Sequence, residues 1–172
     1  KDNVNGIDYL MKKNKIEVIM GTGKLKSAKK LEVKSEDGKT KELSAKNIII
    51  ATGARSRELP NLPQDNEKII GYRKAMTLEK MPKSMVVVGS GAIGVEFAYV
   101  YQSMGVEVTI IEYLPNIVPV EDDEVSAQLG RTFKKKGIKI MTNAEVTSVD
   151  TKGKGCKVKV KTKKGEETIE CD

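Results

Sequence analysis

The sequence predicts a mixed α/β fold, in which a βαβ unit with parallel strands is combined with small antiparallel meanders. A short apolar strand at 85–89 runs into a glycine-rich turn and then into a segment with helical periodicity. Two stretches, 16–53 and 138–172, share one plan of short strands joined by glycine-containing turns. At 172 residues, of which 38% are hydrophobic, the chain can form one ordinary domain or two small ones.

Composition narrows the classes of function. The net charge of +7 comes from scattered lysines with acids interleaved and few aromatic residues, which indicates a solvated surface rather than a nucleic-acid site. The chain has no histidine, so any imidazole acid or base must come from outside it. No apolar run reaches the roughly 18 residues of a membrane span, and we expect a protein without membrane contact.

Cys156 and Cys171 are the two cysteines, and neither lies in a CxxC pair or beside metal-ligand partners. We interpret them as ordinary thiols of a reducing compartment rather than as a redox pair or a metal site. This favours a cytoplasmic location, or the mitochondrial matrix in a eukaryote.

The first repeat begins with predicted strands at 16–20, 30–34 and 41–43, with a turn at 36–39. It leads into Ile48-Ile-Ile-Ala51, an uninterrupted apolar run that is typical of a strand buried in a parallel sheet. We therefore expect a meander followed by a parallel strand.

The second repeat has predicted strands at 138–141, 156–160 and 167–170, and it stops before the point that corresponds to the apolar run. By this comparison we expect the chain to stop one strand short of a complete unit. Because Lys1 stands where a start methionine belongs, we expect a fragment of a longer protein.

Between the repeats, the proline-containing segment 58–63 predicts a linker and a domain boundary. This gives two expected domains, 1–63 and 64–172. A short helical turn is expected within 74–80, before Pro82.

The glycine-rich turn reads Gly89-Ser-Gly91-Ala-Ile-Gly94 and opens a helix that Gly105 closes. Gly89 permits the tight strand-to-helix turn, Gly91 lets the backbone approach a pyrophosphate, and Gly94 allows close packing of helix on strand. The first-turn amides and the helix dipole then attract phosphates. A flexible loop is the alternative, but strand, glycines, helix and second strand in this order predict a Rossmann-like dinucleotide-binding unit.

Glu112 ends the second strand, near the roughly 20-residue spacing that this fold expects. Its carboxylate can accept hydrogen bonds from both hydroxyls of the adenine ribose, and it would repel a 2′-phosphate. The acid therefore favours NAD over NADP, with a solvated strand end as the alternative. A methyl-donor nucleoside stays open within the same architecture. A charged helix at 121–137 is interpreted as structural.

Three segments resemble the flavoprotein pyridine nucleotide-disulfide oxidoreductase family, and within it the dihydrolipoamide dehydrogenases. Ile49–Gly53 resembles the strand and turn that leave the FAD domain, Pro82–Phe97 resembles the NAD fingerprint, and Glu112–Pro119 resembles the segment after the second NAD strand. The resemblance covers essentially the whole chain. It implies that 1–63 is the end of an FAD-binding domain with a partial meander, and 64–172 an NAD-binding domain that lacks its final strand.

The resemblance also implies site residues. Gly23, Thr52 and Gly53 are the positions expected near FAD. For Val146, expected at the adenine pocket, an ordinary core strand position is the alternative. The positions expected to bind NAD are Gly89, Gly91, Ile93, Gly94, Glu96, Glu112 and Val146.

In the family, dihydrolipoamide reduces a disulfide, electrons pass through FAD, and hydride reaches NAD. The redox-active CxxxxC, the first FAD glycine loop and the domain with the His-Glu pair are absent here. We therefore expect no catalytic residue in this chain, an inactive fragment, and weak binding of NAD because its sheet is incomplete. The parent is expected to be a homodimer that acts on a lipoyl group within a 2-oxo acid dehydrogenase complex.

Other functions remain as alternatives. NADP-using relatives place alanine at the third glycine and basic residues after the second strand, so Gly94 and Glu112 favour the lipoamide branch. Another disulfide reductase or an NADH oxidase shares these features. A non-catalytic NAD-binding module and a basic scaffold are alternatives from other classes.

Overall fold

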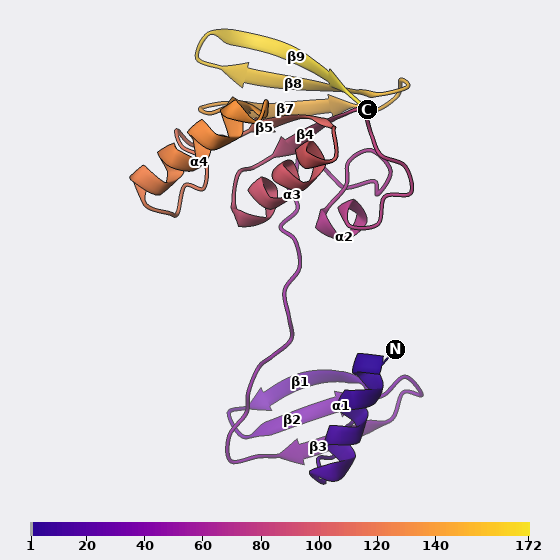
Figure 1. Ribbon diagram of the computed structural model, residues 1–172. Helices are drawn as coiled ribbons and strands as arrows, with labels where there is room; N and C mark the ends of the chain where they lie inside the picture. Colours follow the sequence, from indigo (N-terminus) through magenta and orange to yellow (C-terminus); the bar gives the residue numbers. More distant parts are fainter. Residues whose placement is uncertain (1) are drawn as a thin grey trace. The chain divides into compact units, whose positions relative to one another are not determined.

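The computed structural model describes residues 2–172 and has two compact units, Lys1–Ala54 and Arg55–Asp172 (Figure 1). Helices and sheets occur together, so the expected mixed α/β class is confirmed. The two units divide between Ala54 and Arg55, and Leu62 packs into the core of the second unit.

The first unit contains one helix and one antiparallel sheet of order β1-β2-β3 (Figure 1). Leucines stand opposite one another across the three strands, and Val33 is the buried hydrophobic residue of this sheet. On the solvent side, Lys30 Nζ lies 2.9 Å from Glu42 Oε1. The elements are α1 (Asp2–Lys13), β1 (Thr22–Ser27), β2 (Lys30–Lys34) and β3 (Thr40–Ser44).

Two strand predictions in this unit are wrong. Residues 16–20 form no strand, and β1 begins after them at Thr22. Ile48–Ala51 is also irregular, with Ile49 90% and Ile50 68% exposed. A strand that is apolar along its whole length needs neighbouring strands on both edges and cover on both faces. The sheet of this unit consists of β1, β2 and β3 and does not include Ile48–Ala51, so this segment has no such neighbours.

The second unit is built on a parallel sheet of order β4-β5-β6. Residues 139–141, predicted as part of a meander, instead pair in parallel with β5, which corrects that assignment. The α4 helix begins where the Asp122 carboxylate accepts hydrogen bonds from the amides of Glu124 and Val125. The elements are α2 (Tyr72–Ala75), β4 (Ser84–Val88), α3 (Ala92–Ser103), β5 (Glu107–Ile111), α4 (Asp123–Lys135) and β6 (Lys139–Met141).

An antiparallel meander of β7 (Glu145–Asp150), β8 (Cys156–Thr162) and β9 (Gly165–Cys171) completes the unit. Along β8, the buried Cys156, Val158 and Val160 alternate with exposed lysines. Strand β7 was expected only as the alternative for Val146, an ordinary core strand position, and not as a strand of the repeat.

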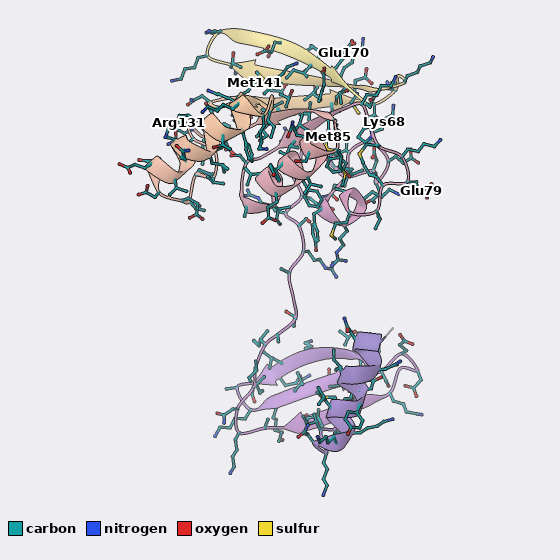
Figure 2. All side chains as sticks on the ribbon, in the orientation of Figure 1. Lys68, Glu79, Met85, Arg131, Met141 and Glu170 are labelled. Carbon is teal, nitrogen blue, oxygen red and sulfur yellow. The ribbon has the colours of Figure 1, made fainter. Side chains whose placement is uncertain are left out.

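The parallel sheet has one core on each face. Ile110 packs with residues of α3 and α4, whereas the next residue, Ile111, packs with the meander. The helices and the meander therefore cover opposite faces of the sheet (Figure 1). Charged side chains such as Arg131 and Glu170 lie on the outside of this unit (Figure 2). Among residues 2–172, no helix is both long and apolar enough to cross a membrane.

Candidate dinucleotide site

The loop between β4 and α3 places its three glycines in three different situations. Gly89 has φ +93°, a conformation that side chains disfavour, and its amide donates to the Ile111 carbonyl at 2.8 Å. A Cβ on Gly91 would meet no atom within 4 Å, whereas a Cβ on Gly94 would overlap the carbonyl oxygen of Gly89. Gly89 is therefore required for its backbone conformation and Gly94 for close packing, whereas Gly91 faces open space.

The open position lies at the N-terminus of α3. Gly91 is the N-cap residue, with an extended backbone and no side-chain cap, and the first turn of α3 contains no acid. The first amides of a helix have no partner within it, and the helix dipole gives this end a partial positive charge. Here backbone amides and open space meet, which is the arrangement that binds a phosphate.

The acid at the end of β5 is buried, and one of its carboxylate oxygens already accepts two hydrogen bonds. Glu112 is 6% exposed. Its Oε2 accepts hydrogen bonds from the Ser90 amide at 2.8 Å and the Ser90 hydroxyl at 2.6 Å, and its Oε1 accepts from the Leu114 amide at 2.8 Å. The sequence indicated a carboxylate open to two ribose hydroxyls, but three of its roughly four acceptor positions are already occupied.

The segment after β5 is held against the glycine loop by the backbone. The Val118 amide donates to the Ser90 carbonyl at 2.9 Å, and the Asn143 amide donates to the Leu114 carbonyl at 3.1 Å. Val118 has φ +43°, which is unfavourable for a β-branched residue. Strain of this kind persists where the surroundings impose it, and it is frequent at binding sites.

Three other predicted positions of the second unit have different surroundings. Ile93 is 56% exposed, and Glu96 is also exposed on the first half of α3. Val146 is 5% exposed, and its carbonyl accepts a hydrogen bond from Asn61 Nδ2 at 2.9 Å. Its packing with Ile111 and Val160 is that of a core strand residue.

The three positions predicted near FAD lie in the first unit. Gly23 is in β1, opposite Val33 of β2. Thr52 and Gly53 lie in the irregular exposed segment after β3, where Gly53 has φ +76°. Among these three positions, Gly53 alone has a positive φ.

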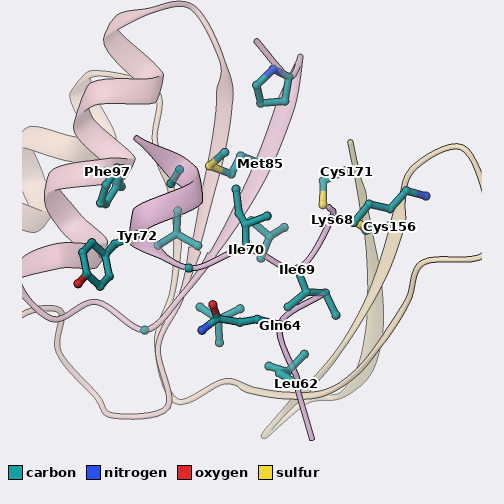
Figure 3. A pocket seen from close by; sticks show the side chains of 18 of the residues that line it. Leu62, Gln64, Lys68, Ile69, Ile70, Tyr72, Met85, Phe97, Cys156 and Cys171 are labelled. Carbon is teal, nitrogen blue, oxygen red and sulfur yellow. The ribbon is translucent and has the colours of Figure 1, made fainter. Parts of the chain in front are cut away.

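A groove of about 1010 Å³ lies along the outer edge of β4 within the second unit (Figure 3). Its wall is mostly apolar and includes Ile69, Ile70, Met85 and Phe97, and it extends to the glycine loop. In the described sheet β4 pairs with β5 alone, so this edge has no strand beside it. The Asp172 carboxylate accepts hydrogen bonds from the backbone amides of Lys83 and Ser84 at the start of β4.

Cys156 and Cys171 border the same groove and stand opposite each other at the end of the β8–β9 ladder (Figure 3). Both are free thiols. Burial raises the pKa of the Cys171 thiol to about 11, and burial also raises the pKa of Cys156. Neutral thiols are poor nucleophiles and poor metal ligands. The described residues contain no group of three or more side chains suited to a metal ion.

Sequence reasoning missed the contribution of Ser90 and of the Leu114 amide. The contact of Ser90 could have been predicted from the sequence. A hydroxyl residue between two glycines of the loop lies beside the end of the neighbouring strand, where Glu112 stands. The Leu114 amide carries no side-chain signature, and its contact follows from the turn after Glu112.

The sequence is similar to one protein family and to several known proteins. The chain matches the family described as pyridine nucleotide-disulphide oxidoreductase over residues 1–172. It is 43% identical to a dihydrolipoyl dehydrogenase of Zymomonas mobilis over 96% of this chain and 36% of that protein. It is 46% identical to one of Rhizobium etli over 87% of this chain and 34% of that protein.

Among solved structures, LpdA from Mycobacterium tuberculosis is similar with a TM-score of 0.81 and 30% identity, over 98% of this chain and 38% of that one. The chain spans about a third of the length of the curated relatives it matches. The family match covers the entire chain, and this chain belongs to the pyridine nucleotide-disulphide oxidoreductase family.

Proposed function

We propose that this chain is the NAD-binding segment, with the end of the FAD-binding domain, of a dihydrolipoyl dehydrogenase. The observation that carries the proposal is the open Gly91 position at the uncapped N-terminus of α3, beside a buried acid at the end of β5. The two dihydrolipoyl dehydrogenase relatives support the choice of enzyme within the family. In this proposal 1–63 comprises the end of the FAD domain and the linker, part of which packs on the second unit, and 64–172 is the NAD domain.

The residues present fit a dinucleotide. Open space at Gly91 leaves room for a pyrophosphate, and the amides of the first turn of α3 would bind its oxygens. Glu112 would accept from the adenine ribose and repel a 2′-phosphate, which favours NAD over NADP. Ile93 and Glu96, exposed on the same helix, would lie along the nicotinamide half.

The chemistry of the reaction would come from the cofactors. When bound, FAD would supply electrons that NAD would accept as hydride, after a disulfide outside this chain had oxidised dihydrolipoamide. The task of this chain is to bind and orient NAD, with Gly23, Thr52 and Gly53 contributing backbone near FAD. A homodimeric parent within a 2-oxo acid dehydrogenase complex is part of the same proposal.

A second candidate is another disulfide reductase or an NADH oxidase, because the loop and Glu112 would serve those enzymes equally. A non-catalytic NAD-binding module is the third. The observations on this chain concern the dinucleotide site and not the disulfide substrate, and the choice of dihydrolipoyl dehydrogenase depends on the relatives.

The test uses the protein encoded by the gene region that contains this segment with both flanks. We expect dihydrolipoamide to bleach its flavin without oxygen, and NAD⁺ then to reoxidise it. A Gly91→Val variant is expected to retain flavin reduction by dihydrolipoamide and to lose NAD⁺ reduction, because its side chain would fill the phosphate space. A protein without flavin, or flavin reduction by NADH alone and not by dihydrolipoamide, would contradict the proposal.

A further inference from the structure

Ser90 gives the buried acid two of its three hydrogen bonds. Its side chain has no exposure to solvent. Its amide and its hydroxyl both donate to Glu112 Oε2, at 2.8 Å and 2.6 Å. A carboxylate oxygen offers about two acceptor positions, so Oε2 is saturated before any ligand arrives.

Glu112 has fewer free acceptor positions than an adenine ribose has hydroxyl donors. Glu112 Oε1 accepts from the Leu114 amide and retains about one free position. An adenine ribose brings two hydroxyl donors, at its 2′ and 3′ carbons. Recognition of both hydroxyls by Glu112 therefore requires one of the present donors to leave.

Only one of the three donors is free to rotate. The Ser90 and Leu114 amides belong to backbone that is fixed by the Val118-to-Ser90 and Asn143-to-Leu114 hydrogen bonds. The Ser90 hydroxyl turns about its own side-chain bonds. Its departure would leave the loop and the buried carboxylate in place.

We propose that the Ser90 hydroxyl competes with the nucleotide ribose for Glu112 Oε2 and rotates away when the dinucleotide binds. The inference rests on the proposed function of the loop. In the free chain the hydroxyl satisfies a buried carboxylate, which otherwise would lose a charge-assisted hydrogen bond. In the complex the ribose replaces it, so Ser90 lowers affinity for nucleotides that carry both hydroxyls.

The experiment measures binding of AMP, 2′-deoxy-AMP and 3′-deoxy-AMP to the full 172-residue chain by NMR titration. We expect Ser90→Ala to bind AMP about 3–10-fold more tightly than the unchanged chain, because the competing donor is gone. Neither deoxy nucleotide should gain more than about twofold, since one hydroxyl needs only the free position on Oε1.

Ser126→Ala is the matched control. Ser126 is also a buried serine, and its hydroxyl donates to the Val118 carbonyl rather than to Glu112. This variant should leave the three dissociation constants unchanged. Weaker binding of AMP by Ser90→Ala, or an equal gain for AMP and both deoxy nucleotides, would overturn the inference.

A second measurement needs no variant at Ser90. In the unchanged chain, removal of one ribose hydroxyl should weaken binding by less than about threefold, whereas two uncontested hydrogen bonds to a carboxylate predict a loss of about tenfold or more. A tenfold loss would overturn the inference. Glu112→Gln distinguishes a failure of this inference from a failure of the proposed function. If this variant binds AMP as tightly as the unchanged chain does, the proposed function itself is refuted.

Discussion

Replacing Gly94 by alanine is expected to destabilise the second unit. The added Cβ would overlap the carbonyl oxygen of Gly89, which is backbone and cannot swing aside. Carbon atoms in contact normally lie about 3.5–4.0 Å from their neighbours, so the helix and the loop must separate. Overpacking of this kind costs about 1–3 kcal/mol, and the gain in helix propensity, at most about 1 kcal/mol, offsets part of it.

The assay is urea unfolding of the chain followed by circular dichroism, with Gly91→Ala as the control. At Gly91 a Cβ meets nothing within 4 Å and φ is −64°, so stability should change by less than about 0.5 kcal/mol. We expect Gly94→Ala to lower the free energy of unfolding by about 1–2 kcal/mol. Equal stability of the two variants would refute the reasoning.

Three further predictions concern the polar side chains Glu112, Cys171 and Lys68. Glu112→Gln should lower the free energy of unfolding by about 1–3 kcal/mol, measured with urea, because an amide N–H would face donors of Ser90 or Leu114. The pKa of Cys171 is raised from 9.0 to about 11, so the rate of thiol labelling should increase with pH up to about pH 11. The stability that the neutral thiol contributes should be present below pH 9 and lost as the pH rises through 11. Lys68→Met should speed hydrogen exchange in 151–155, because Lys68 Nζ donates to three carbonyls there.

Labelling of Cys171 that is as fast at pH 8 as that of a free thiol would contradict the second of these predictions. Unchanged exchange in 151–155 would contradict the third. For Glu112→Gln, a variant as stable as the unchanged chain would show that the buried hydrogen bonds contribute nothing net.

The elements with strong local signals were predictable from the sequence. The strand at 85–89, the helix after Gly91 and the charged helix near 121–137 have matching counterparts in β4, α3 and α4. Their periodicity, glycine positions and capping acids act locally. The apolar run Ile48–Ala51 shows the limit of this reasoning, because a buried strand depends on neighbours that its own residues do not specify.

The conformation of the glycine loop was also predictable at Gly89, which has a positive φ, and at Gly94, where a side chain would overlap the Gly89 carbonyl. The state of Glu112 was not, because it depends on which donors from separate segments converge on one carboxylate. In β7 the apolar Val146 and Val149 are three positions apart, with a register shift between them, so the alternation that marks a strand is missing and the sequence signal was weak. Contacts between segments distant in the chain account for these differences.

The most direct test of the proposed NAD site is an NMR titration of the ¹⁵N-labelled chain with NAD⁺ and with NADP⁺. We predict weak binding of NAD⁺, with a Kd above about 0.1 mM, because β4 is an edge strand in the described sheet. Shifts should centre on Gly89, Gly91, Gly94 and Glu112, and NADP⁺ should bind more weakly still. No shift at the glycine loop, or tighter binding of NADP⁺, would contradict the account.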